Sequence, residues 1–280
     1  PDQWMAVLAA AQQPAPLVLR VNTRRSTVAA FCQRLEDAGI DARALGGAAV
    51  WLPTPVPVSA IPGFAEGCAS VQSAAAQLAG PLLLSRLENP APRGLGARAA
   101  PGSKTAHLLE LCPAAHVTAL EIDAARSRRI ADNLARLGLE AEIRVANAAD
   151  VPGWWRGERF DAILLDAPCS ASGIVSRHPD VRWLRRDSDI AQLAAAQDRL
   201  LQALWPLLRP GGHLLYCTCS VFRQEGEQRV AAFAANNTDV GLLPSPGHLL
   251  PAAGGGAVSL GDNGGRDDGF YYALLHKRTD

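Results

Sequence analysis

The chain has 280 residues, 48% of them hydrophobic, and its 27 Lys and Arg residues balance 27 Asp and Glu residues. This length and composition predict a globular protein of one large or two modest domains and exclude disorder throughout the chain. Because the net charge is zero, a nucleic-acid partner would have to bind a local basic patch, and because no long apolar run is present, no membrane-spanning helix is expected.

Residues 1–88 are predicted to form a small α+β domain of the RRM-like kind. Its predicted elements are a strand at 17–21, a helix at 27–38 ended by Gly39, a short strand at 50–52, a proline-rich extended connector at 53–62 and a helix at 71–87. Two prolines in residues 88–93 place the domain boundary there.

In residues 89–280, strands and helices alternate, which predicts an α/β domain with a mostly parallel sheet covered on both faces. The predicted strands are 116–122, 143–146, 160–165, 213–219 and 270–275, and the predicted helices are 124–137, 188–208 and 225–235. A Pro-Gly-Gly turn is expected at 210–212, and a flexible glycine-rich loop at 253–265.

The six cysteines lack the spacing of a small disulfide scaffold. No secretory signal is visible, so we expect reduced thiols and a cytoplasmic protein, and the start at Pro1 indicates a fragment or a processed chain. Cys217 and Cys219 share one face of a predicted strand, as two zinc ligands would, but no second Cys or His pair completes four ligands. No metal is therefore expected, and the sequence does not indicate an oligomeric state.

Small residues at 99–105 form a tight turn between a predicted strand and a helix. Such a turn lets backbone approach a ligand and aims helix N–H groups at a carboxylate or phosphate, although it matches neither the dinucleotide-binding nor the Walker A pattern. Glu121, at the end of the next strand, is a candidate acceptor for ribose hydroxyls. Together these features favour a nucleoside-bearing cofactor, while an ordinary turn and a solvated acid remain the alternatives.

Two apolar runs deliver cysteines to the carboxyl edge of the predicted sheet, where ligands of α/β proteins bind. Residues 164–169 read LLDAPC, with Asp166 and Cys169, and residues 213–219 end on Cys219. Pro168 stops strand pairing and fixes a turn before Cys169. Two thiols and an aspartate indicate thiolate addition to an electrophilic ring, although Cys169 alone could be a buried structural cysteine.

A second segment concentrates four arginines and a tryptophan within residues 176–186. Guanidinium groups suit phosphates and an aromatic ring suits a base, so RNA contacts are expected at Arg177, His178, Arg182, Trp183, Arg185 and Arg186. Arg20 belongs to a smaller basic group in the first domain and is predicted to contact RNA as well. The alternative is a solvated loop whose arginines pair with Asp180, Asp187 and Asp189.

The motifs of this chain, in their order, resemble those of the RNA cytosine-C5 methyltransferases. They are AAPGSKT at 99–105, an acid after the second strand, LLDAPCSASG at 164–173, RHPDVRWLRR at 177–186 and YCTCS at 216–220. The arginine-rich signature is similar to the bacterial branch that acts on 16S ribosomal RNA. The resemblance implies a Rossmann-like S-adenosylmethionine-dependent methyltransferase domain behind the small domain. It also implies that an amino-terminal NusB-like helical domain of the family is missing here.

The resemblance assigns roles to particular residues. Cys219 matches the nucleophile that adds to C6 of cytosine, Cys169 matches the cysteine that assists loss of the C5 proton and product release, and Asp166 would lie near the cofactor and the cytosine edge. The implied cofactor-binding positions are Arg98, Ala99, Ala100, Pro101, Gly102, Ser103, Lys104, Glu121, Asn147 and Asp166. The target base would have to leave any stack to reach the two thiols.

Several positions depart from the family pattern, and most of them concern the cofactor. Gly94 and Gly96 weaken a central strand, Arg98 stands where a small thiol is usual, Ser103 replaces a glycine and Asn147 replaces an aspartate. These departures support an alternative function, a degenerate relative that binds RNA with an impaired cofactor site. A DNA cytosine methylase using Cys169 as the nucleophile is a third hypothesis, which the YCTCS motif and the arginine-rich segment disfavour.

Overall fold

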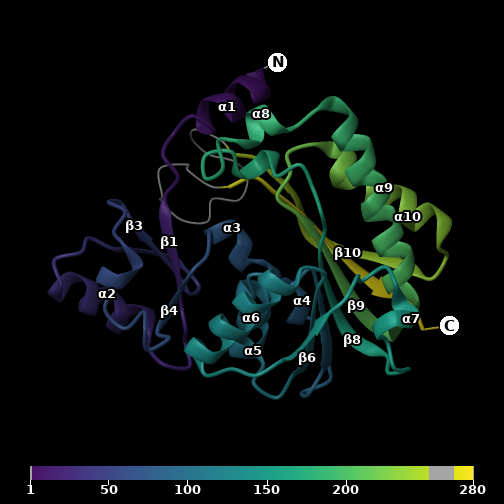
Figure 1. The fold of residues 1–280 in the computed structure, drawn as a ribbon, viewed down its shortest axis with the longest axis horizontal. Helices are drawn as coiled ribbons and strands as arrows, with labels where there is room; N and C mark the ends of the chain where they lie inside the picture. The colour runs from purple at the N-terminus through teal and green to yellow at the C-terminus, as the bar shows by residue number, and fades with distance from the viewer. Residues whose placement is uncertain (1, 252–267, 280) are drawn as a thin grey trace.

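The computed structural model describes residues 2–251 and 268–279, and the glycine-rich loop predicted at 253–265 lies outside the described residues. Figure 1 shows a small sheet with one helix beside a larger sheet that carries helices on both faces. The predicted α/β class, with a Rossmann-like domain and a small α+β domain, is confirmed. The division between residues 88 and 89 stays a prediction.

The small sheet has the strand order β2-β3-β1-β4, and its paired strands are antiparallel. Its elements are β1 (Leu17–Val21), α2 (Val28–Asp37), β2 (Arg43–Gly46), β3 (Ala49–Leu52) and β4 (Ala69–Val71). The hydroxyl of Thr27 caps α2 by accepting the N–H of Ala30, and Phe31 and Leu35 pack on the sheet. This is a split βαβ arrangement, with a short 3₁₀ turn at Val58–Ala60 where a second helix would cross.

The large sheet has the order β10-β11-β9-β8-β5-β6-β7. Its strands are β5 (Arg93–Ala97), β6 (His116–Glu121), β7 (Glu142–Val145), β8 (Phe160–Asp166), β9 (Leu208–Thr218), β10 (Val240–Leu249) and β11 (Phe270–Lys277). The five strands from β7 to β9 pair in parallel, whereas β11 is antiparallel to both β9 and β10. The carboxyl ends of β5, β6, β8 and β9 therefore meet at one edge of the sheet, where a ligand site is expected.

Helices cover both faces of this sheet, as Figure 1 shows. One face carries α7 (Val151–Trp154), α9 (Asp187–Leu204) and α10 (Glu227–Asn236), and the other carries α3 (Ala74–Gln77), α4 (Ala79–Leu84), α5 (Ser103–Leu111) and α6 (Ala124–Leu137). The remaining helices are α1 (Asp2–Ala10) and α8 (Val181–Leu184). Among the described residues, no helix is long and apolar enough to cross a membrane.

Several predicted elements differ from those observed. The helix predicted at 71–87 is a strand end followed by the two short helices α3 and α4, because Ala69–Val71 pairs with β1 and Ser73 starts a new helix by capping it. The turn predicted at 210–212 lies inside β9, because this strand already begins at Leu208. The two glycines fall where the pairing of β9 with β8 shifts its register. The helix predicted at 188–208 ends at Leu204 and continues as a 3₁₀ turn, and the one predicted at 225–235 begins at Glu227.

A buried ion pair joins the small sheet to the large domain. Arg20 of β1 is 0% exposed, and its Nε and Nη2 donate to the two carboxylate oxygens of Glu110 in α5 at 3.0 and 2.8 Å. The guanidinium also donates to Gln72 and to the carbonyl oxygen of Ser103. Because Arg20 is fully buried and four of its N–H groups donate within the protein, the structure does not support an RNA contact there, and that contact stays a prediction.

Candidate active site

The two predicted catalytic cysteines come together at the carboxyl edge of the large sheet. Cys169 follows β8 and Cys219 follows β9, and their sulfur atoms are 3.4 Å apart although fifty residues separate them in the sequence. Both are partly exposed, so a reactant can approach the pair from solvent. All six cysteines are free thiols.

The thiol proton is shared unequally between these sulfurs. A hydrogen bond from Cys219, together with the backbone N–H of Ala171, lowers the pKa of Cys169 against the opposing effect of burial. The same hydrogen bond, and then burial, raises the pKa of Cys219. Of the two thiols, Cys169 is therefore the one whose pKa is lowered and Cys219 the one whose pKa is raised.

Asp166, the last residue of β8, lies beside the pair. Its carboxylate accepts from Lys104 Nζ at 2.6 Å and from the buried thiol of Cys217 at 3.6 Å. Burial by itself would lower the pKa of Lys104. The negative charge of Asp166 and its hydrogen bond favour the protonated amine, and the net effect raises the pKa of Lys104 above its ordinary value. Burial raises the pKa of Cys217, which therefore remains a neutral thiol against the carboxylate. The structure thus joins Asp166, Lys104 and the cysteines in one site.

Two buried polar residues that the sequence analysis did not single out hold the loops of the site. Gln197 of α9 is 0% exposed and donates to the carbonyl oxygen of Pro168 at 2.7 Å. Glu225 is also 0% exposed, and its carboxylate accepts from Ser170 and Ser220, which directly follow the two cysteines. The signal for Glu225 in the sequence was an acid shortly after the YCTCS motif, but nothing local marks it as buried.

The predicted cofactor loop lies between β5 and α5. Arg98 adopts a positive φ of 58°, Ala99 donates to the carbonyl of Leu120 at 2.8 Å, and Gly102, at φ 97°, starts the helix. Gly94 and Gly96 do not break β5, which pairs with β6 and β8 along its length. The departures noted in the sequence are therefore compatible with an ordered strand and loop.

A cavity of about 210 Å³ opens beside this loop at the strand ends. Its walls include Arg98, Ile122, Asn147, Pro168 and Arg199, so mostly apolar side chains enclose it with one amide and two guanidinium groups. The amide oxygen of Asn147 accepts the N–H of Ala149 at 3.1 Å, which orders the loop after β7. A flat heterocycle matches such a slot.

Glu121 occupies the predicted place at the end of β6, but its carboxylate is 0% exposed. It accepts the backbone N–H groups of Ala100 and Asp123 at 3.3 and 3.2 Å, and Arg126 lies 3.5 Å away with a partly exposed side chain. A ribose could reach this carboxylate only if the Arg126 side chain moved aside. The role predicted for Glu121 stays a prediction.

Replacing Gly102 by alanine tests how tightly the cofactor loop is packed. The new Cβ would lie 3.2 Å from Ile130 Cα and Cγ2, at a φ that alanine adopts at a cost of about 1–2 kcal/mol. We expect Gly102→Ala to lower the free energy of unfolding by about 2–4 kcal/mol in urea denaturation. Gly39→Ala is the matched control, because its φ is 73° but nothing lies within 4 Å of the new Cβ. Equal losses in the two variants would contradict close packing at Gly102.

The arginine-rich segment lies over the loop that carries Cys169, and several of its side chains are held by the protein. Arg177 pairs with Asp268 at 2.8 Å, Arg182 donates to the carbonyl of Ala11 and Arg185 to the carbonyl of Ser170. These partners are not the aspartates that the sequence suggested. His178, Arg182, Trp183, Arg185 and Arg186 are all exposed, with Trp183 at 86%, and of these His178, Trp183 and Arg186 are not used in the contacts above.

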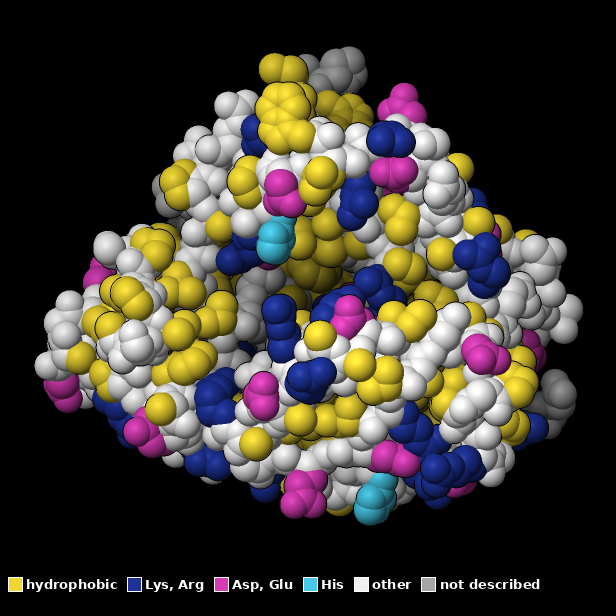
Figure 2. All heavy atoms as spheres, in the orientation of Figure 1, with side chains coloured by type: hydrophobic (Ala, Val, Ile, Leu, Met, Phe, Trp, Pro, Cys, Tyr) yellow, Lys and Arg dark blue, Asp and Glu magenta, His cyan; other side chains and the backbone are white. Residues whose placement is uncertain are grey.

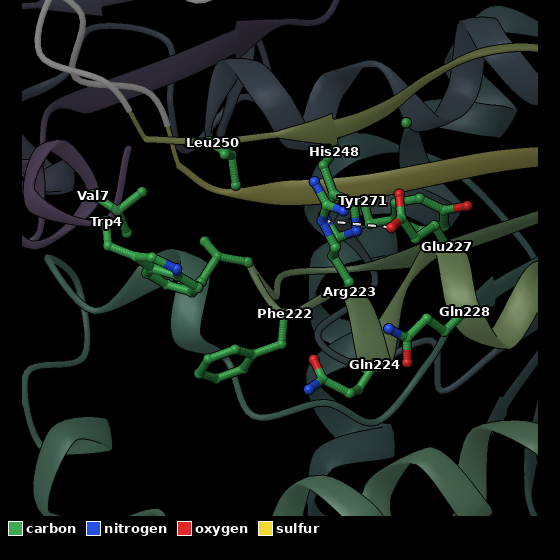
Figure 3. A pocket seen from close by; sticks show the side chains of 12 residues that line it. Trp4, Val7, Phe222, Arg223, Gln224, Glu227, Gln228, His248, Leu250 and Tyr271 are labelled. Atoms are coloured by element: carbon green, nitrogen blue, oxygen red, sulfur yellow. Dashed lines mark ion pairs between the residues drawn. The ribbon is translucent and has the colours of Figure 1, made fainter. Parts of the chain in front are cut away.

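The surface around these elements is hollowed. Figure 2 shows a depression near the centre of the view, between the parts labelled α3 and α8 in Figure 1, with hydrophobic atoms deep inside and Lys and Arg side chains around it. A second hollow of about 760 Å³ lies beside the loop after Cys219 (Figure 3). Trp4 and Phe222 line it with ring centroids 5.9 Å apart. Within the described residues, no group of three or more His, Cys, Asp or Glu could hold a metal ion.

The chain matches two family models. One, described as 16S rRNA methyltransferase RsmB/F, covers residues 87–276, and another, for a ferredoxin-like domain of RsmF/B-like methyltransferases, covers residues 1–59. Relatives named ribosomal RNA small subunit methyltransferase B in Vibrio cholerae and Klebsiella pneumoniae are 45% and 44% identical over 99% of this chain. The chain spans only 62% and 63% of the length of these two relatives.

Two solved structures resemble the fold over nearly the whole chain. A methyltransferase homolog protein from Pyrococcus horikoshii is 28% identical with a TM-score of 0.80, over 99% of this chain and 91% of that one. NSun6 from Pyrococcus horikoshii with SFG is 18% identical with a TM-score of 0.82, over 100% and 95% of the two chains, and shows the fold alone. Because the first family model matches well over half of the residues, the resemblance found in the motifs is confirmed and the chain belongs to the 16S rRNA methyltransferase RsmB/F family.

Proposed function

We propose that this chain transfers a methyl group from S-adenosylmethionine to C5 of a cytosine in RNA, with 16S ribosomal RNA as the substrate and the cytoplasm as its location. The observation that carries the proposal is the placement of two free thiols 3.4 Å apart, next to Asp166 and Lys104, at the ligand-binding edge of a methyltransferase fold. The relatives' printed names support the substrate.

In this proposal Cys219 adds to the cytosine ring. Its sulfur forms a bond to C6 while its proton passes to the neighbouring Cys169, and the electron pair of the C5–C6 bond becomes available at C5. Asp166, held by Lys104, lies where a carboxylate favours protonation of the ring. Once C5 has taken the methyl group, Cys169 passes the proton that it received to solvent, and its thiolate accepts the C5 proton. The electron pair of the C5–H bond restores the C5–C6 double bond, the bond between Cys219 and C6 breaks, and the Cys219 thiolate leaves. The resemblance assigns assistance in this second half to Cys169.

The cofactor, when bound, supplies an electrophilic methyl group to C5. The cavity lined by Arg98, Ile122 and Asn147 suits its adenine ring, since the walls are mostly apolar and one amide can recognise the ring edge. The loop from Ala99 to Lys104 and the start of α5 would hold the rest of the molecule, with Lys104 fixed by Asp166.

RNA would be bound by the exposed part of the arginine-rich segment. Trp183 offers a free ring for base stacking, and Arg186 and His178 lie beside it on the surface. Arg177, Arg182 and Arg185 would act mainly by holding the segment against the active-site loops, because their guanidinium groups already have protein partners.

A calorimetric titration with S-adenosylmethionine tests the cofactor part of the proposal directly. We expect one-to-one binding, because the cavity and the cofactor loop are formed in the protein alone. A folded sample that binds no cofactor at millimolar concentration would overturn the proposal in favour of an RNA-binding relative without transferase activity. Methyl transfer to cytosine-containing RNA, assayed with labelled cofactor, then tests the reaction.

A further inference from the structure

We propose that Glu225 is a positioning residue that ties the two cysteine loops together and so sets the distance between Cys169 and Cys219. The inference rests on the proposed function for its catalytic meaning, but its geometry stands on the structure alone. Glu225 lies in the 3₁₀ turn Arg223–Glu225, just before α10, and touches neither cysteine sulfur through a hydrogen bond.

The carboxylate of Glu225 joins both loops by three donors. Its Oε1 accepts the backbone N–H of Ser170 at 2.8 Å, and its Oε2 accepts the hydroxyl groups of Ser170 and Ser220, each at 2.6 Å. Ser170 follows Cys169 and Ser220 follows Cys219, so each donor lies one residue from a catalytic sulfur. Since β8 and β9 end before these serines, strand pairing does not fix the loops, and the carboxylate adds a second connection to the direct hydrogen bonds between them.

Glu225 is itself held in place. The hydroxyl of Tyr216, inside β9, donates to its backbone carbonyl at 2.8 Å, and the whole residue is 0% exposed. The two loops are also joined directly: the N–H of Gly173 donates to the carbonyl of Cys219 at 2.9 Å, the N–H of Val221 donates to the hydroxyl of Ser172 at 3.1 Å, and the hydroxyl of Ser220 contacts those of Ser172 and Ser170 at 3.1 and 3.4 Å. A buried carboxylate needs such donors to be tolerated, and here every donor to its side chain comes from a cysteine loop.

An amide cannot reproduce this arrangement. Glutamine has one oxygen and one NH₂ group. Its nitrogen would either oppose the N–H of Ser170, donor against donor, or face the two hydroxyls, which would then accept longer, uncharged hydrogen bonds in place of the short ones that they donate to the carboxylate. We therefore expect Glu225→Gln to release at least one loop and to separate the two sulfur atoms. Glutamine has nearly the same size as glutamate, so the substitution changes the hydrogen bonds and the charge but not the packing.

The pH dependence of Cys169 alkylation by iodoacetamide, mapped by mass spectrometry on the full chain, separates the possible roles of Glu225. The pKa of Cys169 is lowered chiefly by its hydrogen bond from Cys219, while the negative charge of Glu225 opposes that shift. If Glu225 positions the loops, Glu225→Gln breaks the contact between the sulfurs and the alkylation midpoint moves to higher pH. If Glu225 acts only by its charge, the midpoint moves to lower pH, and if it only stabilises the fold, the midpoint stays. Either of the last two results overturns the proposal.

Two further variants complete the test. Ser220→Ala removes one donor and leaves the other two, so it should move the midpoint in the same direction by less, and it carries the test if Glu225→Gln does not fold. Glu227→Gln is the matched control, because Glu227 is half exposed, lines the hollow of Figure 3 and pairs only with Arg223 there, at 3.5 Å. Its midpoint should equal that of the wild type.

Methyl-transfer kinetics provide the second readout. A displaced thiol pair should lower kcat by about 10²-fold in Glu225→Gln with little change in KM for RNA. If Glu225→Gln shifts the midpoint of Cys169 alkylation but leaves kcat unchanged, the positioning of the cysteines by Glu225 does not matter for catalysis. If the wild type transfers no methyl group, the proposed function fails, whereas the alkylation experiment still decides whether Glu225 positions the cysteines.

Discussion

Cys219→Ala is expected to lower methyl transfer by at least ~10³-fold, which corresponds to about 4 kcal/mol of activation free energy. Without the Cys219 sulfur no bond to C6 can form, and the C5 carbon of cytosine is not nucleophilic enough to take the methyl group. Cys169→Ala should behave differently, because it removes the hydrogen bond that raises the pKa of Cys219, so that Cys219 can lose its proton to solvent and still add to the ring. That variant should accumulate a covalent adduct of protein and RNA, seen as a slowly migrating band on a denaturing gel.

The contrast between the two variants carries the test. An adduct in Cys219→Ala, or methyl transfer that survives it, would reverse or remove the assigned roles. Cys112→Ala is the matched control, because Cys112 is a partly exposed free thiol at the end of α5, whose sulfur contacts only the carbonyl of Pro90 at 3.6 Å. It should retain wild-type transfer and form no adduct. Circular dichroism of all three variants checks that they are folded.

Arg20→Met is expected to lower the free energy of unfolding by about 3–5 kcal/mol. Arg20 and Glu110 are 0% and 3% exposed at their side chains, so the substitution leaves a buried carboxylate without its counter-charge. The same change removes the donors to Gln72 and to the carbonyl of Ser103, at the start of α5. Urea unfolding followed by tryptophan fluorescence measures the loss.

The double variant Arg20→Met with Glu110→Leu shows whether the cost arises from the unpaired charge. Replacing both partners by apolar side chains should recover most of the lost stability, since the desolvated charge is gone. Arg223→Met serves as the control on the surface, where a 71% exposed side chain should cost about 0.5 kcal/mol or less. A loss below 1 kcal/mol in Arg20→Met, with weaker RNA binding, would contradict the structural role and point back to an RNA contact.

The elements with strong local signals were predictable from the sequence. The strand Leu17–Val21 and the helix capped by Thr27 match their predicted bounds almost residue for residue, because β-branched residues and a cap fix them locally. Strand β10 was not predicted, since Pro244, Pro246 and Gly247 interrupt its pattern. Such residues are tolerated because β10 is an edge strand with only β11 beside it.

The candidate site could be predicted only in part, for a physical reason. Strand ends of an α/β sheet converge, so the neighbourhood of Asp166, Cys169 and Cys219 followed from their positions after apolar runs. The burial of a charged side chain has no such local signal. In the sequence, Arg20 resembled a surface cation and Glu225 an acid at the start of a helix. Only the three-dimensional structure shows that both charged side chains are buried.

The placement of β11 has a consequence for how the protein is made. Strand β9, which leads to Cys219, pairs with β8 on one side and with β11 on the other, where Tyr272 lies opposite Cys217 and Tyr271 opposite Thr218. On the ribosome, β8 and β9 emerge well before Phe270–Lys277 is synthesised. Until then β9 presents an open edge on this side, which is the kind of surface that promotes aggregation of nascent chains. The two thiols therefore gain their final surroundings only when β11 docks against β9.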